Sequence, residues 1–387
     1  MLRRRPTHGR SATGEGPLKI AHIDTGMELR GGQRQLLLLA SGLRDRGHQQ
    51  LIVCPNGSAL EERAQQHGFD VFSLRRRGLR RLRGMLVLRR VLRRDGFQIL
   101  HAHDGRGQTV STLASLALPV RRVATRRVTF MPRGLGRVFK LHRLQYGSFC
   151  HAIIAVSAYV RDLLVRTGVQ ASKIEVIPDG ITIPDELPGN DVRDGARRRW
   201  NLATDALVLG HAGAFTREKG QDVLLEAFLR MTGSAPNARL LLAGEGPLRD
   251  TSRISELLRK SEGRARVLDW MDDLTPFFAA LDLYVMPSRS EGLGSSALLA
   301  MAHGLPVVAS RVGGLSEVVE DGVTGWLVPA ESPDELAQAL LTAVSCPDSL
   351  HRFGASARER ARAFSGDTMV SHTEALYRHL LSGADSS

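Results

Sequence analysis

Residues 288–329 read SRSEGLGSSALLAMAHGLPVVASRVGGLSEVVEDGVTGWLVP, and this stretch decides the fold. The apolar run that leads into it, LDLYVMPS (281–288), and the later PVVAS are typical of buried parallel strands. Between them, Glu291-Gly292-Leu293-Gly294 forms a loop, and an apolar helical stretch begins at Ser295. A strand, a loop, a helix and a further strand in this order predict a βαβ unit.

The same alternation extends over almost the whole chain. In the first half, strands are expected at 18–24, 49–55, 69–74 and 97–103 and in RRVATRR, HAIIAVS and KIEVIPDG, with a long basic helix at about 78–95. In the second half, ALVLGHAGAF, ARLLLAGEG and RARVLDW indicate strands, QDVLLEAFLRM indicates a helix, and the chain ends in helices at about 333–345, 349–363 and 368–382. This pattern predicts an α/β protein with two doubly wound parallel sheets and a cleft between them. Ligands of such sheets bind outside the carboxyl ends of the strands.

Breaks in the pattern divide the chain. Residues 1–17 are basic and rich in Gly, Ser and Thr, without the apolar segment of a signal peptide, so a disordered tail and no export are expected. The first domain covers 18–184. Residues 185–204 (DELPGNDVRDGARRRWNLAT) are rich in Pro, Gly, Asn and charge and are interpreted as a linker before a second domain at 205–365.

Composition excludes several classes of protein. The chain of 387 residues has 42% hydrophobic and 24% charged residues, a globular balance, and no apolar run approaches the ~18–20 residues of a membrane span. Its three cysteines have no zinc or redox spacing, which fits a reducing cytoplasm. The net charge of +13 divides unevenly into +20 for residues 1–200 and −7 for residues 201–387. Such asymmetry points to a polyanionic partner of the first half or to a merely solubilising arginine surface.

Two further loops have residues suited to a phosphate. In DTGMELRGGQRQ (24–35), Gly31-Gly32 precede a helix whose first amides can bind an anion, although a tight turn without a ligand explains them equally well. In HAGAFTREKGQDVLLEAF (211–228), Gly213 ends a strand and Lys219-Gly220 precede a helix, with Arg217 as a second cation. A solvated loop is the alternative there. The sequence contains neither GxGxxG at the first loop nor GxxxxGK[ST], which disfavours ordinary dinucleotide and P-loop sites.

Ten ordered elements resemble one family, the retaining nucleotide-sugar glycosyltransferases of the GT-B fold, family 4 (glycosyl transferases group 1). They are GG before the first helix, HAHDG, AVSAYVRDLL, VIPDGI, EKGQDVLLEAF, LLLAGEGPLR, LDLYVMPSRSEGLG, MAHGLPVVAS, VGGLSEVV and DGVTGWLV. The resemblance covers about residues 18–382 and implies two Rossmann-like domains, the first for the acceptor and the second for the donor. It also implies that the last segment, 366–387, is a helix that crosses back to the first domain.

The resemblance also implies roles for particular residues. His103 would lie beside the transferred sugar, Lys219 would neutralise the diphosphate, and Glu291 would hold sugar hydroxyls, so these three are the expected catalytic residues. Three further sets of residues are expected to bind the donor. The donor phosphate would contact Gly31, Gly32, Arg217 and Ser295, and the donor sugar would contact Gly292, Leu293 and Gly294. The nucleotide would contact Gly213, Gly244, Glu245, Gly246, Val267, Leu268 and Trp270. A cation and helix N-termini would stabilise the charge that develops on a departing diphosphate. No metal and no other cofactor is expected, and the sequence has no D-x-D pair.

Two positions depart from the family pattern. Leu299 stands where the second glutamate of the E-x7-E motif would hold the ribose, and Ala214 stands where many members have an arginine. A lost ribose contact would cost on the order of 1–3 kcal/mol of donor binding. A catalytically weak or inactive relative is therefore the alternative to an active enzyme.

His101 and His103 alternate at the end of a predicted strand and therefore face the same side. His103 is expected at the sugar with His101 as its support, and Asp104 follows directly. Metal binding by the pair is an alternative, but no third ligand has a convincing spacing. No double-displacement nucleophile can be identified from the sequence.

The basic segment 73–96 (SLRRRGLRRLRGMLVLRRVLRRDG) combines ten arginines with an apolar face. Leu79, Leu82, Met85 and Leu86 are expected to share that face, extended by Leu88, Val91 and Leu92, and to pack on the sheet. The arginines then lie in solvent or contact an anionic membrane surface, where each would contribute about 1 kcal/mol. Nucleic-acid binding is the rival interpretation and is not expected, because aromatic residues make up only 5% and no RNA- or DNA-binding motif accompanies the arginines.

Taken together, the sequence predicts a hexosyltransferase. It would move a sugar from a nucleotide-sugar donor, with a UDP-sugar favoured, to a hydroxyl of a glycan or glycolipid, such as lipopolysaccharide core or a lipid-linked saccharide. The anomeric configuration would be retained. A cytoplasmic location, with peripheral contact at the inner face of the membrane, is expected.

Overall fold

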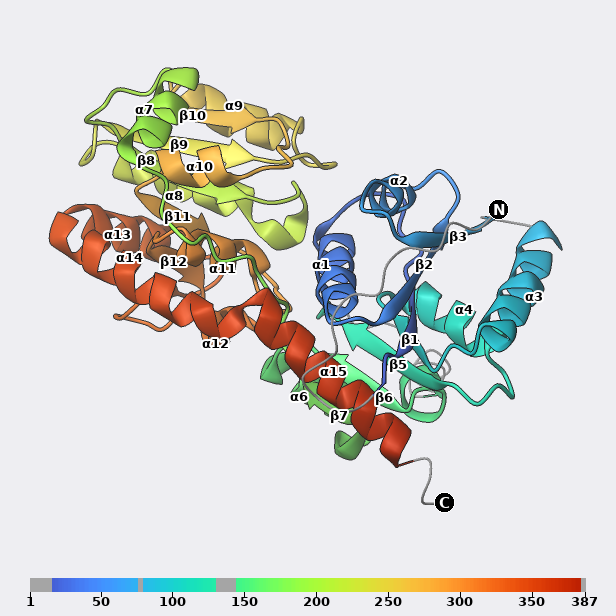
Figure 1. Ribbon diagram of the computed structural model, residues 1–387. Helices are drawn as coiled ribbons and strands as arrows, with labels where there is room; N and C mark the ends of the chain where they lie inside the picture. Colours follow the sequence, from blue (N-terminus) through green and yellow to red (C-terminus); the bar gives the residue numbers. More distant parts are fainter. Residues whose placement is uncertain (1–15, 76–78, 130–143, 384–387) are drawn as a thin grey trace. The chain divides into compact units, whose positions relative to one another are not determined.

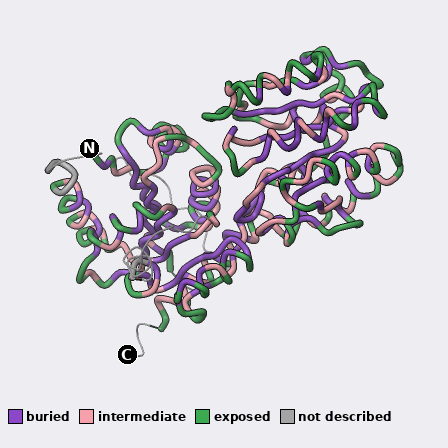
Figure 2. Tube along the Cα trace, turned by 180° about the vertical axis from the view of Figure 1, so that it is seen from behind, coloured by how far each residue is buried: buried purple, intermediate pink, exposed green. Residues whose placement is uncertain are grey.

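The computed structural model describes residues 16–75, 79–129 and 144–383, and within them the chain forms two compact units (Figure 1). Unit 1 comprises the chain up to Gly180 together with the segment from Gly366 onward, and unit 2 runs from Ile181 to Ser365. Both contain one parallel sheet covered by helices, as predicted from the alternation of strands and helices. Figure 2 shows buried segments running through the interior of both units, with exposed segments around them.

Unit 1 has a seven-stranded sheet in the order β3-β2-β1-β4-β5-β6-β7. Its strands are β1 (Lys19–Ile23), β2 (Gln49–Pro55), β3 (Asp70–Leu74), β4 (Ile99–Ala102), β5 (Arg121–Arg126), β6 (Ala152–Ala155) and β7 (Ile174–Val176). Its α-helices are α1 (Gly31–Asp45), α2 (Ala59–Gln66), α3 (Leu79–Arg94), α4 (Gly105–Ala114), α6 (Ala158–Arg166) and α15 (Gly366–Ser382). A π-helical turn, Leu144–Ser148, and a 3-10 turn, Ala171–Lys173, complete it.

The inner strands of unit 1, such as β1, β4 and β6, are buried almost throughout because each face of the sheet is covered by helices. Ile20, Ile99 and Val123 pack with residues of α1 and α15 on one face. Ala21, Val53 and Leu100 pack with residues of α3 and α4 on the other. Residues two apart on a strand share a face, so the residues that follow Ile20 and Ile99 at this spacing, His22 and His101, lie on the side of α1 and α15.

Unit 2 has a six-stranded sheet in the order β10-β9-β8-β11-β12-β13. Its strands are β8 (Leu207–Ala212), β9 (Ala238–Ala243), β10 (Ala265–Leu268), β11 (Leu283–Met286), β12 (Val307–Ser310) and β13 (Gly325–Val328). Its helices are α7 (Asn190–Arg199), α8 (Gln221–Met231), α9 (Ser252–Lys260), α10 (Thr275–Ala280), α11 (Ser295–Ala302), α12 (Leu315–Val318), α13 (Pro333–Val344) and α14 (Pro347–Ala361). Two 3-10 turns, Arg217–Lys219 and Arg362–Phe364, lie between these elements.

The stretch 185–204, expected as a linker, is instead part of unit 2 and contains α7. Two of its arginines, Arg193 and Arg197, are bound inside the unit rather than solvated. Arg197 is 3% exposed, donates to the carbonyls of Thr204 and Ala206, and pairs with Asp282. Arg193 donates to the Leu281 carbonyl and to the same Asp282 carboxylate. The guanidinium groups of Arg193 and Arg197 therefore attach α7 to the rest of unit 2. This is the physical reason why the linker interpretation was wrong.

The basic helix α3 also differs from expectation in one respect. Met85, Leu88 and Leu92 are buried against the sheet, but Leu86, expected on the same face, is 59% exposed and lies beside the exposed Val87. Residues 85, 88 and 92 follow helical spacing and form the buried face of α3, and Leu86 lies outside this face. The expectations for Arg76 and Arg77, and for most of the tail 1–17, concern residues outside the described ranges, and those for Leu79 and Leu82 concern side chains that are not described.

Candidate functional site

In both units, several of the predicted site residues follow the strands between which the strand order reverses. In unit 1 the chain builds β1, β2 and β3 toward one edge and then continues from β4 on the other side of β1. In unit 2 it builds β8, β9 and β10 and then continues from β11 on the other side of β8. The loops after β1 and β4, and those after β8 and β11, therefore diverge to opposite faces and leave room for a ligand between them.

In unit 1, two carboxylates, Asp104 and Asp24, accept hydrogen bonds in these loops, and Asp104 joins the loop after β4 to the loop after β1. Asp104 follows β4 and caps α4 through the Gly107 amide at 2.9 Å, and it also accepts bonds from the backbone and hydroxyl of Thr25. Asp24 follows β1, is 1% exposed, and accepts from the Gly26 amide and from Gln33, each at 2.8 Å. Burial, reinforced by Asp24, raises the pKa of Asp104. The sequence indicated Asp104 but not Asp24.

Gly31 and Gly32 begin α1, and nothing in the described residues requires them to be glycine. A side-chain Cβ on Gly31 would meet no atom within 4 Å, and one on Gly32 would meet only the Arg127 Cδ, at 4.0 Å. Neither glycine has a positive φ. The first backbone amides of a helix are the groups with which such a segment can bind an anion.

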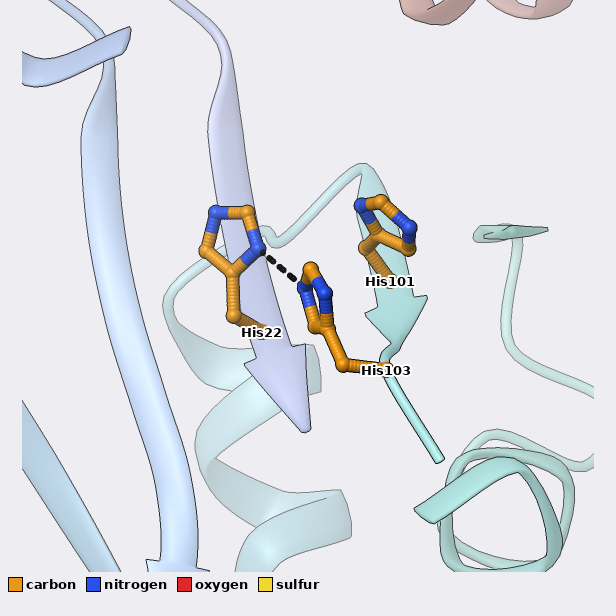
Figure 3. A group of neighbouring side chains, drawn as sticks. All are labelled: His22, His101 and His103. Carbon is orange, nitrogen blue, oxygen red and sulfur yellow. Dashed lines mark hydrogen bonds between the residues drawn. The ribbon is translucent and has the colours of Figure 1, made fainter. Parts of the chain in front are cut away.

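Three histidines cluster on strands β1 and β4 (Figure 3). His22 lies opposite His101 in the register of the two strands, and His103 follows two residues later, with its Nε2 3.0 Å from the His22 Nδ1. The His101 and His103 rings lie 4.1 Å apart. All three side chains are buried. His22 was not expected from the sequence, because only the pairing of β1 with β4 brings it to the pair.

Each ring nitrogen of the cluster has a hydrogen-bond partner. His101 contacts the Tyr377 hydroxyl and the Thr125 hydroxyl, each at 2.6 Å, His22 also contacts Gln50, and His103 also contacts Arg127. Burial lowers the pKa of His22 to about 4 and lowers the pKa of His101 and His103 well below 6.5. The rings are therefore neutral at pH 7. One ring nitrogen from each histidine lies within 4.8 Å of the others, so the three could hold a metal ion, with His22 as a candidate third ligand that the sequence spacing did not indicate.

Arg127 and Asp179 are site residues that sequence reasoning missed. The Arg127 Nε donates to the Asp179 Oδ1 at 2.8 Å, and the side chains of both are at most 13% exposed. The Arg127 Nη1 lies 3.3 Å from the His103 Nδ1. Arg127 follows β5 directly, so its place at a strand's carboxyl end was a signal that could have identified it.

In unit 2, Lys219 and Glu291 meet. The Lys219 Nζ lies 2.6 Å from the Glu291 Oε1, which also accepts from the buried Ser288 hydroxyl at 2.8 Å. Lys219 comes from the loop after β8 and Glu291 from the loop after β11, so the pair lies at the reversal point of the sheet. The structure thus brings together the two residues that the sequence singled out separately.

Two helices begin beside this pair. Gly220 caps α8 with φ +69°, and a Cβ there would come within 2.2 Å of the Pro287 carbonyl oxygen. Gly294 caps α11 with φ +102°, and Ser295 is the first residue of that helix. Arg217 lies on the same turn as Lys219 and is exposed. The side chain of Leu293 is buried in the core, which leaves only its backbone for a ligand.

The expected nucleotide residues divide into two groups. Close packing of the loops after β8 and β9 requires glycine at 244 and 246, because a Cβ on Gly244 would come within 2.1 Å of the Gly213 carbonyl oxygen and one on Gly246 within 2.7 Å of the Phe215 backbone. A Cβ on Gly213 would lie 3.2 Å from the His211 Nε2, so this position is only tightly packed. Val267 and Leu268 end β10 and are half-buried, while Glu245 and Trp270 are exposed, Trp270 to 38%. The strand order brings the loops after β8, β9 and β10 to one edge of the sheet.

Arg289 is a further residue that the sequence did not indicate. It pairs with both oxygens of Asp222 at 2.8 Å and with Glu331 at 2.7 Å, and it donates to the Arg217 carbonyl. A bidentate pair of this kind fixes orientation as well as distance. Arg289 therefore ties the loop that contains Glu291 to the first turn of α8 and to the turn that contains Lys219.

The two departures from the family pattern lie in the same unit. Leu299 is half-buried on α11, and its carbonyl accepts from the backbone and ring of His303. Ala214 precedes Phe215, whose backbone packs on Gly246. The His211 ring, also buried, contacts the Val285 carbonyl at 2.9 Å, and burial lowers the pKa of His211 to about 4.

Comparison with known proteins identifies what this architecture is similar to. Two family models match the chain: Glycosyl transferases group 1 over residues 206–345, and Glycosyltransferase Family 4 over residues 29–183. Among curated proteins, D-inositol 3-phosphate glycosyltransferase of Streptomyces griseus is 36% identical over 233 residues, which is 57% of this chain and 49% of that protein. The corresponding protein of Kribbella flavida is 33% identical over 56% of this chain and 53% of its own length. The chain thus matches about half the length of these relatives.

Solved structures share the whole fold. Anabaena Alr3699/HepE in complex with UDP superposes with a TM-score of 0.84 at 22% identity, covering 94% of this chain and 100% of that one. Sucrose-phosphate synthase from Thermosynechococcus elongatus superposes with a TM-score of 0.78 at 21% identity, covering 95% and 100%. At these identities the likeness establishes the fold.

Proposed function

The chain belongs to the glycosyl transferases of group 1 and has their GT-B fold, and from this premise we propose that it transfers a sugar from a nucleotide-sugar donor to a hydroxyl of a glycan or glycolipid. A UDP-sugar is the first candidate. Structural neighbours were solved with UDP and with UDP-glucose bound, which supports this choice of donor.

The observation that carries the proposal is the Lys219–Glu291 pair at the reversal point of unit 2. A departing nucleoside diphosphate develops negative charge. The Lys219 ammonium and the first amides of α8 and α11 would stabilise that charge electrostatically. The Glu291 carboxylate would accept hydrogen bonds from sugar hydroxyls, because an ionised carboxylate is an acceptor with several lone pairs. The same site would then bind both the diphosphate and the sugar, which are the two groups joined by the bond that breaks.

For unit 1, the family resemblance implies that Gly31 and Gly32 approach the donor phosphate and that His103 contacts the transferred sugar, and both roles form part of the proposal. Transfer with retention of the anomeric configuration follows from the family resemblance and forms part of the proposal. Leu299 cannot accept a bond from a ribose hydroxyl, so a catalytically inactive relative is the competing outcome.

Product analysis tests the proposal. Nucleotide sugars are first screened by thermal shift, and those that raise the melting temperature are incubated with glycan and glycolipid acceptors. We expect a product whose anomeric proton coupling in NMR matches that of the donor. If nucleotides bind but no acceptor or water is glycosylated, the protein is an inactive relative, and an inverted product would contradict the retaining mechanism.

The exposed surface of α3 and α4 is the proposed membrane contact. None of the helices within the described ranges is long and apolar enough to span a bilayer. Leu86 and Val87 on α3, Leu113 on α4 and Leu116 just after α4 are exposed, and Arg89 of α3 donates to the Leu116 carbonyl. Exposed arginines on α3 flank them: Arg83, Arg90, Arg93 and Arg94. Apolar side chains beside cations fit anionic lipid headgroups.

Co-sedimentation tests this contact. The protein should pellet with phosphatidylglycerol vesicles at low salt, and much less with phosphatidylcholine vesicles. Leu86→Ser should weaken the binding, whereas Val165→Ser, at an exposed position on α6 of the same unit, should leave it unchanged. Equal binding by the two variants, or none by the wild type, would contradict a lipid-binding role of α3 and α4.

A further inference from the structure

Four side chains in unit 1 form one continuous hydrogen-bonded chain: Arg127, His103, His22 and Gln50. The Arg127 Nη1 lies 3.3 Å from the His103 Nδ1, the His103 Nε2 lies 3.0 Å from the His22 Nδ1, and the His22 Nε2 lies 2.8 Å from the Gln50 Oε1. Residues from β1 and β2, the end of β4 and the end of β5 contribute to it, so the chain crosses the reversal point of the sheet.

The protons of this chain have only one consistent arrangement. A guanidinium can donate but not accept, so the His103 Nδ1 must accept and the proton of His103 must be on Nε2. That proton is donated to the His22 Nδ1, which places the proton of His22 on Nε2. The His22 Nε2–H then donates to the Gln50 carbonyl oxygen. Arg127, His103 and His22 each donate in the same direction, toward Gln50, which accepts the last bond.

The opposite direction fails at Arg127. If the Gln50 amide were reversed, its nitrogen would donate to the His22 Nε2, and the two histidines would have to carry their protons on Nδ1. The His103 Nδ1–H would then point at the Arg127 guanidinium, donor against donor. A protonated His103 meets the same conflict. The observed orientation leaves the Gln50 Nε2 without a partner among the described residues, which is the cost of this arrangement.

Arg127 keeps its place because it is bound on its other side. The Asp179 carboxylate accepts from the Arg127 Nε at 2.8 Å and balances its charge. The uncharged state of the rings agrees with their environment, since burial lowers the pKa of both His22 and His103. Buried neutral rings whose nitrogens are all engaged keep a single orientation.

We infer that Arg127 and Gln50 are positioning residues that hold His103 as the neutral Nε2–H tautomer, with both ring nitrogens occupied. His103 consequently has no free lone pair with which to act as a proton acceptor. Its contribution is that of a fixed, uncharged group. The importance of this for sugar transfer rests on the proposed function, whereas the tautomer itself does not.

Nitrogen NMR of the full-length protein tests the inference directly. With 15N-labelled histidine, long-range 1H–15N spectra at pH 7.5 distinguish Nε2–H, Nδ1–H and doubly protonated rings, and single histidine substitutions assign the signals. We expect both His22 and His103 as Nε2–H. Either ring as Nδ1–H or as imidazolium would overturn the inference. So would stoichiometric displacement of all three cluster signals by Zn²⁺, which would show a metal site instead.

Variants of Gln50 sharpen the test. Gln50→Glu retains an acceptor oxygen and should preserve both tautomers, whereas Gln50→Leu removes it and should allow the Nδ1–H form. Gln98→Leu is the matched control, because Gln98 accepts from the Lys19 amide at the other end of β4. If the leucine variant of Gln50 does not fold, the wild-type and Gln50→Glu spectra still decide the question.

Kinetics give the second measurement. A positioning role predicts that Gln50→Leu lowers kcat about tenfold with the donor KM changed less than about twofold, and that Gln50→Glu restores most of kcat. A loss confined to KM would contradict positioning. If no donor supports transfer at all, the proposed function fails while the spectra still decide the tautomers.

Discussion

At the scale of single residues, Lys219 and Glu291 are each other's partners in the structure, 2.6 Å apart. A donor that binds there would place a diphosphate against the ammonium and sugar hydroxyls against the carboxylate. On donor binding, Lys219 and Glu291 would then give up the bond between them, and each would contact a different part of the same ligand. Ser288, which donates to the same Glu291 oxygen, would keep that carboxylate in place during the exchange.

Truncation of either residue tests this use of the pair. We expect Lys219→Ala and Glu291→Ala each to lower the rate of transfer at least about tenfold, because each removes a charged contact formed with the reacting groups. Circular dichroism should show an unchanged fold. Lys260→Ala serves as the control, since Lys260 lies on α9 and pairs with Glu256. Near-normal rates in both site variants would contradict the assignment.

The sequence predicted these two residues because each lies next to glycines after a strand, a local signal. It predicted His101 and His103 from another local signal, their alternation at the end of a predicted strand. His22, Gln50 and Tyr377 were missed because their roles arise from which strands pair and which helix covers them. Those contacts join residues as far apart as 101 and 377, and no local pattern specifies them.

At the scale of elements, α15 contributes a side chain that contacts the histidine cluster. Its Tyr377 is fully buried, and its hydroxyl lies 2.6 Å from the His101 Nδ1. Met369 and Val370 of the same helix belong to the apolar core of unit 1. The last helix of the chain therefore supports the buried polar groups of the first sheet.

Tyr377→Phe tests that support. The change leaves the His101 Nδ1 without its partner in a buried position and should lower the free energy of unfolding by about 1–3 kcal/mol. Urea unfolding followed by far-UV circular dichroism measures it. Tyr159→Phe, at an exposed position on α6, should change the free energy by less than about 0.5 kcal/mol. Equal effects of the two substitutions would show that the His101 contact does not stabilise unit 1.

The elements themselves were largely predictable, because strands buried on both faces give continuous apolar runs. Strand β2 was placed at 49–55 and is found there. Helix α7 was not predicted, since its pattern of Gly, Asp and Arg is typical of a solvated linker. The charges of Arg193 and Arg197 stabilise α7 only because backbone carbonyl groups and the Asp282 carboxylate surround them.

At the scale of the whole molecule, buried neutral histidines make stability depend on pH. Burial lowers the pKa of His22 and His211 to about 4, whereas an unfolded histidine titrates near 6.5. Below pH 6.5 the unfolded chain binds protons that the folded chain does not bind, so stability present above pH 6.5 is lost as the pH falls toward 4. Each such group should cost about 2 kcal/mol between pH 7 and pH 5.

Urea unfolding at the two pH values measures this loss. Trp200, Trp270 and Trp326 all lie in unit 2, so tryptophan fluorescence reports on the unit that contains His211. The midpoint should be lower at pH 5 than at pH 7. His211→Asn keeps a donor for the Val285 carbonyl without a titrating ring, and its midpoint should fall less. A wild-type midpoint that is equal or higher at pH 5 would contradict neutral burial of these rings.

The central claim is that the chain binds a nucleotide-sugar donor at Lys219 and Glu291. Calorimetric titration of the full-length protein with a panel of nucleoside diphosphates and their sugars tests it most directly. The account predicts that at least one ligand binds, and that Lys219→Ala weakens its binding about tenfold while Lys260→Ala does not. It would be contradicted if no nucleotide or nucleotide sugar bound, or if Lys219→Ala bound the ligand as tightly as the wild type.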